Sequence, residues 1–310
     1  MKLSLPAARF TSPLSSFVAA FALAAASAAV LTAQGQSAPA GQASRPVSVV
    51  GKNVPRTPDG HPDLQGVWAN NMATPLERPK GLADKAVLSD AELGEFKRRA
   101  AELFDGAGDT AFGDGVYNAV LAAQAAAKAG DTSYKKGGTG DYNSFWLVDR
   151  EFENRTSLIF DPPDGRMPPL TPEAQKRNAA NADERKAHPA DGPENLPLAV
   201  RCLTYGVPRL GGLNAGYNSY YEFVQTRDAV AIHSEMIHEA RIIPLDGRPH
   251  VPAAIRQWQG DPRGHWEGDT LVVDTTNFSS KSSYQGAHEN LHVVERFTRV
   301  SEDILHHEIR

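Results

Sequence analysis

Residues 220–278 constrain the fold more than any other part of the chain, because apolar and polar residues alternate there over a long distance. Successive side chains of a β-strand point to opposite faces of a sheet, so this period of two is typical of strands. Between residues 230 and 242 one parity is mostly apolar. The other parity carries the polar stripe, which we define as His233, Glu235, Glu239 and Arg241. We therefore expect one extended segment with an apolar face and a polar face.

Turn signals divide the rest of this stretch. Residues 245–249 form one turn, and the Gly268-Asp269 pair can supply the positive φ that a two-residue hairpin needs. Residues 270–276 are rich in β-branched side chains on both parities, which predicts a returning strand covered on both faces. The same patterns predict further strands at residues 66–68, 145–148, 155–160, 217–225, 291–300 and 303–310.

Helical signals are concentrated in the first half of the chain. Ser89 and Glu92 match a capping box, and apolar residues then recur at helical spacing. An alanine-rich run over residues 116–129 ends at Gly130, and Pro172 can occupy the first turn of a third helix. We therefore expect a mainly β domain, either barrel-like in the manner of lipocalins and calycins or a β-sandwich, with helical insertions at residues 89–130 and 171–187.

The first residues have the organisation of a secretory signal peptide. Lys2 and Arg9 precede an apolar, alanine-rich run, and small residues allow cleavage after Ala28 or Ala33. We expect a signal peptide at residues 1–33, a flexible leader at 34–56 and a single domain at 57–310, which predicts a secreted or periplasmic protein. No later run is long enough to span a bilayer, so we expect no stable membrane insertion after cleavage.

Composition excludes one class of partner and one source of stability. The formal net charge of −5 gives no basic surface for nucleic acid, so no nucleic-acid partner is expected. Cys202 is the only cysteine, so no intramolecular disulfide can form and the fold must depend on core burial. The expected last strand reaches Arg310 without a turn or polar tail, which predicts that the natural chain continues further.

Four motifs carry a resemblance to a known group of proteins. They are residues 57–68 (TPDGHPDLQGVW), 161–166 (DPPDGR), 244–250 (PLDGRPH) and 266–278 (WEGDTLVVDTTNF). Together they resemble a family of secreted bacterial proteins of uncharacterised function, and the similarity covers most of the chain from about residue 55. The resemblance implies export and a longer chain, and it implies no activity and no catalytic residue.

The polar stripe is the first candidate site. It is either a solvated outer face or the lining of a cavity in which histidine acts as acid or base and arginine holds an anion. Glu295 is either a buried ion-pair partner of the neighbours around Arg296 or a general base with a raised pKa. The candidate catalytic residues are therefore His233, Glu235 and Glu295, and the candidate binding residues are Arg241, Arg248, His250, Trp258, His265 and Trp266.

These residues predict a binding protein for a small molecule or a glycan fragment. One alternative is a lyase, isomerase or hydrolase that uses the stripe, and another is a structural envelope protein. A third is a zinc hydrolase, because His288, Glu289 and His292 match H-E-x-x-H. The apolar residues that follow predict a strand there instead, and on a strand the two histidines lie about 13 Å apart, too far for one metal. No phosphate loop or dinucleotide fingerprint is visible, so we expect no cofactor and no metal.

Overall fold

The computed structural model describes residues 53–70, 72–104, 114–130, 150–205, 218–282, 284 and 287–310 of the 310-residue chain. The expected signal peptide, most of the expected leader and the expected strand at residues 145–148 lie outside these residues. Within the described part of the chain, no helix is long and apolar enough to cross a bilayer.

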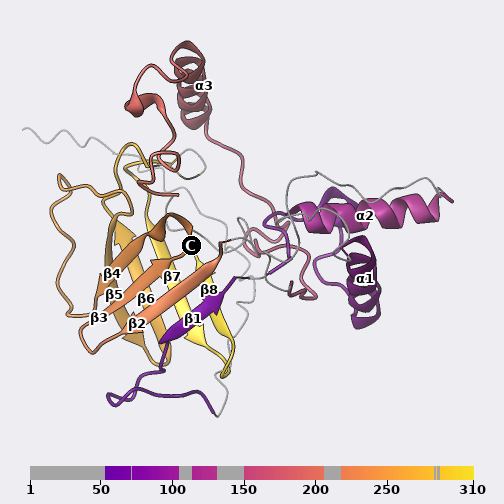
Figure 1. The fold of residues 1–310 in the computed structure, drawn as a ribbon, viewed down its shortest axis with the longest axis horizontal. Helices are drawn as coiled ribbons and strands as arrows, with labels where there is room; N and C mark the ends of the chain where they lie inside the picture. Colours follow the sequence, from indigo (N-terminus) through magenta and orange to yellow (C-terminus); the bar gives the residue numbers. More distant parts are fainter. Residues whose placement is uncertain are drawn as a thin grey trace, which may run out of the picture. The chain divides into compact units, whose positions relative to one another are not determined.

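The fold is mainly β, as predicted, and consists of two four-stranded sheets in which every neighbouring pair is antiparallel. The strands follow one another in chain order in both sheets (Figure 1). Among the described strands no hydrogen-bonded ladder joins β4 to β5 or β8 to β1, so no closed barrel is found. The first sheet contains β1 (Gly66–Ala69), β2 (Tyr220–Gln225), β3 (Ala229–Ser234) and β4 (Ala240–Pro244). The second contains β5 (Asp261–Glu267), β6 (Thr270–Thr276), β7 (Val293–Arg299) and β8 (Leu305–Ile309).

The predicted hairpin between β5 and β6 is confirmed. Gly268 has a φ of 60°, in the left-handed region that a two-residue hairpin requires, and Glu267 pairs with Thr270 across the turn. From there the register brings Trp266 opposite Leu271.

The prediction of one extended segment over residues 230–242 is wrong. β3 ends at Ser234, a short 3-10 helix follows (Met236–His238), and the chain returns as β4, with Ile232 opposite Arg241. Ile237 and His238 have φ values of 60° and 46°, which turn the backbone. The apolar parity therefore changes at the turn: Val230 and Ile232 are buried in β3, and Ile243 is buried in β4.

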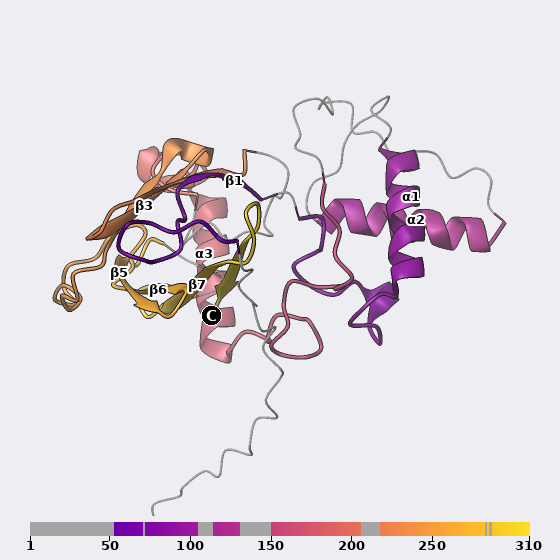
Figure 2. The same cartoon turned by 90° about the horizontal axis from the view of Figure 1, so that it is seen from below.

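The main core lies between the two sheets. Phe223 from β2 meets Phe297 from β7 edge to face, with ring centroids 5.5 Å apart. In Figure 2, β1 and β3 lie in one layer, and β5, β6 and β7 lie in the other. The buried cluster that joins the layers contains Leu64, Phe223, Val230, Ile232, Ile243, Leu271, Val273 and Phe297.

The predicted helices are confirmed: α1 (Asp90–Leu103), α2 (Asp114–Lys128) and α3 (Pro172–Ala187). Ser89 and Glu92 form the expected capping box of α1. The helices α1 and α2 share a second apolar cluster, in which the rings of Phe96 and Tyr117 lie 4.2 Å apart. Two further short 3-10 helices span Lys80–Leu82 and Pro193–Asn195.

The strand predicted at residues 155–160 is absent. Individual backbone N–H groups of this segment donate to chain without regular secondary structure. Leu158 N donates to Pro75 O at 2.8 Å, and Ile159 N donates to Leu76 O at 3.1 Å. These bonds satisfy the backbone without a strand ladder.

Candidate ligand-binding site

A pocket of about 680 Å³ opens beside β4, the edge strand of the first sheet. Its other wall is the segment of residues 256–260 that leads into β5. This volume falls in the range typical of sites for small organic molecules. The side chains that decide its chemistry are Glu239, Arg241, Ile242, Arg256, Trp258 and Gln259.

The side chain of Arg241 points into the interior, because residues that pair across β3 and β4 share one face of the sheet. It lies opposite Ile232, a core residue, so its side chain points between the sheets and is only 9% exposed. There it meets Glu295 of β7, whose neighbour across the ladder is the core residue Val273. The Nη2–Oε2 and Nη1–Oε1 distances are 2.5 and 3.1 Å, so this end-on ion pair links the two sheets.

The charge of Glu295 has a second partner. Nε2 of His307, in β8, lies 3.1 Å from Oε1 of Glu295, and the imidazole ring stacks on Phe297. Burial opposes ionisation of Glu295, yet the charge of Arg241 and the hydrogen bonds from His307 and Arg241 outweigh it, and its pKa falls to about 2. The ion pair expected from the sequence is present, but its partner is Arg241 on the other sheet and not a neighbour of Arg296. The raised pKa that the general-base interpretation requires is wrong.

Two polar atoms of the pocket lack hydrogen-bond partners among the described residues. They are Nε of Arg241 and Oε1 of Gln259, and both are shielded from solvent. The end-on contact with Glu295 engages the two terminal nitrogens of Arg241 and leaves the Nε–H unused. A buried polar atom without a partner costs about 1–3 kcal/mol, so such atoms require a physical explanation.

The wall that carries Trp258 is held in place by the chain that follows β6. Gln257 N donates to Asn277 O at 3.0 Å, and Ser282 Oγ donates to Trp258 O at 2.7 Å. Gly260 has a φ of 71°, and a Cβ there would lie 2.5 Å from Thr276 O, so only glycine allows this approach. The aromatic wall is therefore preorganised.

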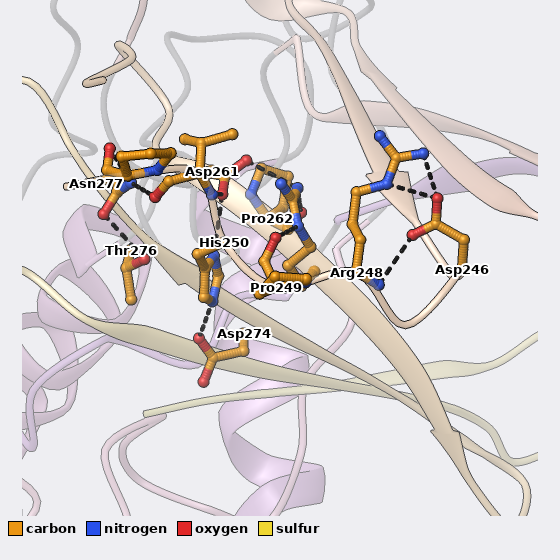
Figure 3. A network of polar contacts seen from close by, with 12 residues as sticks. Asp246, Arg248, Pro249, His250, Asp261, Pro262, Asp274, Thr276 and Asn277 are labelled. Atoms are coloured by element: carbon orange, nitrogen blue, oxygen red, sulfur yellow. Dashed lines mark hydrogen bonds and ion pairs between the residues drawn. The ribbon is translucent and has the colours of Figure 1, made fainter. Parts of the chain in front are cut away.

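A second polar cluster surrounds His250 (Figure 3). Its Nδ1 lies 3.1 Å from Oδ2 of Asp261, and its Nε2 lies 2.9 Å from Oδ1 of Asp274. His292 Nε2 reaches the other oxygen of Asp274 at 2.8 Å. Although burial opposes it, hydrogen bonds from His292 and His250 lower the pKa of Asp274.

The His250 cluster lies on the opposite face of the second sheet from Glu295. In β5 the side chains of Asp261 and Arg263 alternate with Pro262, which lines the pocket. Arg263 bonds Asp261 Oδ1 at 2.8 Å, and Val251 N donates to Asp261 Oδ2 at 2.9 Å. The cluster therefore fixes the loop before β5, and His250 is not brought into the pocket.

The structure divides the polar stripe between two faces. His233 and Glu235 are exposed, and His233 lies 3.6 Å from Glu222 on the outer face of the first sheet. Glu239 and Arg241 are both mostly buried and line the pocket. The interpretation of the polar stripe as one continuous lining of a cavity is therefore wrong.

The remaining predicted binding residues are dispersed. Arg248 is exposed and pairs with Asp246, and His265 is exposed beside Glu267. Trp266 packs on the main core and stacks on His61, with ring centroids 4.5 Å apart. Of the predicted residues, Arg241 and Trp258 line the pocket, and Glu295 lies directly behind Arg241.

The H-E-x-x-H sequence forms a turn that enters β7, as its flanking residues predicted, and it is not helical. His288 bonds Ser280 O, whereas His292 bonds Asp274. Within the described ranges no group of three or more His, Cys, Asp or Glu side chains is placed to hold a metal ion. The zinc alternative needs the H-E-x-x-H residues on a helix, and that geometry is not found among them.

Sequence reasoning missed three residues of this region. Gln259 and Arg256 follow no periodic pattern, so nothing in the sequence marks them as pocket residues. For His307 the sequence held one signal. It shares its strand parity with the apolar residues Leu305 and Ile309, which predicts that the three side chains lie on the same face of the strand.

Comparison of the chain with protein-family models, with curated proteins and with solved structures found no match.

Proposed function

We propose that the protein binds a small organic molecule in the pocket between β4 and the segment of residues 256–260. The observation that carries the proposal is the pair of unsatisfied polar atoms on Arg241 and Gln259, two side chains that line this pocket. A bound molecule that supplies hydrogen bonds to these atoms would account for the lack of partners among the described residues.

Binding is better supported than catalysis. Glu295 is ionised far below neutral pH and is already engaged by Arg241 and His307, so it is a poor proton carrier near pH 7. The catalytic alternative needs His233 and Glu235 beside Arg241, and these residues lie on different faces. We therefore propose a binding protein and no reaction.

The compartment is part of the proposal. A signal-like sequence at residues 1–33 and the resemblance to secreted proteins support a secreted or periplasmic location, with cleavage after Ala28 or Ala33. We further propose that the two sheets form an open variant of a lipocalin-like barrel or a β-sandwich, with a small molecule or glycan fragment as partner and no nucleic acid. The net charge of −5 supports the last point.

The test is a thermal-shift screen of the full chain against a diverse collection of small molecules, followed by calorimetric titration. A ligand at one hundred times its Kd stabilises the folded state by about 2.7 kcal/mol, which raises the melting temperature measurably. We expect Trp258→Ala to weaken binding of each hit by about tenfold or more.

The matched control is Tyr220→Ala, which removes an exposed aromatic side chain from β2. It should leave binding unchanged. The proposal fails if no compound stabilises the protein, or if Trp258→Ala and Tyr220→Ala affect binding equally.

A further inference from the structure

The charges around the pocket are already matched. Arg241 is neutralised by Glu295 at 2.5 Å. Among the described residues, the other charged side chains of the lining are Arg256 and Glu239, which cancel in formal charge. Arg256 donates to Phe278 O and Glu289 O, at 3.2 and 2.7 Å, and Glu239 accepts from the backbone N–H of residue 205 at 2.7 Å. The described part of the lining therefore has no excess formal charge to attract an ion.

An ionic ligand would also disturb the buried pair. An anion at Arg241 would stand beside the ionised Glu295, and a cation would stand beside the guanidinium of Arg241. Like charges at such short range destabilise one another strongly where water is excluded. A neutral ligand avoids both penalties.

Two polar atoms of the lining determine which hydrogen-bonding groups the neutral ligand must carry. Within the part of the chain that the structure describes, Nε–H of Arg241 is a donor without an acceptor, and Oε1 of Gln259 is an acceptor without a donor. A hydroxyl group both accepts and donates, so hydroxyls on one ligand can serve both atoms. Because both atoms are shielded from solvent, the Gln259 carboxamide must turn towards the ligand, and the side chains that cover Nε of Arg241 must move aside, before hydroxyls can meet them.

The rest of the lining suits a ring with an apolar face. Trp258 is half-buried on its preorganised wall, and Pro262 adds aliphatic surface. Flat aromatic side chains pack well against the C–H face of a saturated ring while hydroxyls at its edge bond to polar groups.

We infer that the pocket takes a neutral, hydroxyl-bearing ring of the sugar class. This inference rests on the proposed function, because it names the ligand class of the same pocket. The structural basis is the combination of a charge-balanced lining, a donor and an acceptor without partners, and one aromatic wall.

The experiment is calorimetric titration of the full chain with a set of related rings. Glucose, galactose and cellobiose are the neutral members, glucuronate is the anionic member, and glucosamine is the cationic member. We expect at least one neutral sugar to bind, and to bind about tenfold or more tightly than either charged analogue.

Gln259→Leu separates the ligand role of the carboxamide from a structural one. The substitution removes an unsatisfied buried acceptor at similar size, so the melting temperature of the unliganded protein should stay the same or rise. Sugar affinity should fall about tenfold. The control, Gln175→Leu on the exposed face of α3, should change neither quantity.

Each adverse outcome identifies what is wrong. Tighter binding of glucuronate or glucosamine overturns the neutral class and leaves the binding function standing. If the only ligands whose binding is weakened by Trp258→Ala lack hydroxyls, the sugar class is likewise overturned and the binding function stands. A lower melting temperature of unliganded Gln259→Leu means that the carboxamide is satisfied in solution, which removes the basis of the inference. Absence of any pocket-dependent ligand in the wider screen rejects the proposed function itself.

Discussion

Glu295 is a fully buried carboxylate beside the apolar core cluster, and its charge is tolerated only because Arg241 and His307 contact it. Glu295→Gln should lower the free energy of unfolding by about 3–5 kcal/mol, because it leaves the buried guanidinium without a counter-charge. Urea unfolding measures this difference.

Two controls establish that the loss comes from an unpaired charge. The double variant Arg241→Met with Glu295→Leu should recover most of the stability, because it removes both charges and keeps apolar volume. Glu102→Gln, which breaks an exposed ion pair with Arg98 on α1, should have little effect. A Glu295→Gln variant as stable as the wild type would contradict the buried pair.

Acid should remove the same stabilisation in the wild type. The folded-state pKa of Glu295 is about 2, below the ordinary value of 4.5, so its contribution is complete above that ordinary value and disappears as the pH falls towards 2. The difference in unfolding free energy between the wild type and Glu295→Gln should therefore shrink between about pH 5 and pH 2. The lowered pKa of Asp274 acts in both proteins alike, so it does not affect the difference. A gap that stays constant with pH would show that Glu295 is not ionised in the fold.

At the scale of elements, Gly264 allows β5 to approach β4. A Cβ on Gly264 would lie 2.6 Å from Leu245 Cδ2 and 2.8 Å from Ile243 Cγ2, and Ile243 is fully buried. Gly264→Ala should therefore destabilise the fold by about 1–3 kcal/mol through overpacking. The control is Gly94→Ala on α1, where no atom lies within 4 Å of the new Cβ, and it should stabilise the protein by about 0.5–1 kcal/mol. Chemical denaturation compares the two, and equal effects would contradict a close contact at Gly264.

The elements that sequence could predict are those with local chemical signals. Ser89 and Glu92 determine where α1 begins, and Gly268 marks the β5–β6 hairpin. The β3–β4 turn has no such signal, because Ile237 adopts a left-handed φ that a β-branched residue rarely takes. In the sequence, the alternation of apolar and polar residues continues through this turn. His233 and Arg241 were therefore wrongly expected on the same face.

The candidate site depends on contacts between distant parts of the chain, and this is why little of it could be predicted. Trp258 and Arg241 were expected near a ligand, but their pocket exists because the segment of residues 256–260 meets the edge of the first sheet. An ion pair was one of two roles expected for Glu295, whereas its actual partner, Arg241, depends on how the two sheets face each other. No pattern within one strand specifies that arrangement.

At the scale of the whole molecule, the two sheets should unfold as one cooperative unit, because one apolar cluster and the Arg241–Glu295 pair join them. Native-state hydrogen exchange should therefore give the amides of β2, β3, β6 and β7 similar opening free energies. The helices α1 and α2 share a separate apolar cluster and should open at a free energy of their own.

Substitutions in the two clusters test this division. Phe297→Ala removes the contact with Phe223 and should lower protection in both sheets equally, although Phe297 belongs to β7 alone. Leu88→Ala, in the cluster of α1 and α2, should lower the protection of those helices while that of β6 and β7 is retained. Exchange measured by mass spectrometry at the level of peptides resolves these segments. If Phe297→Ala weakens only the second sheet, the sheets open independently, and the pocket at their junction would lose the rigid wall on which ligand binding depends.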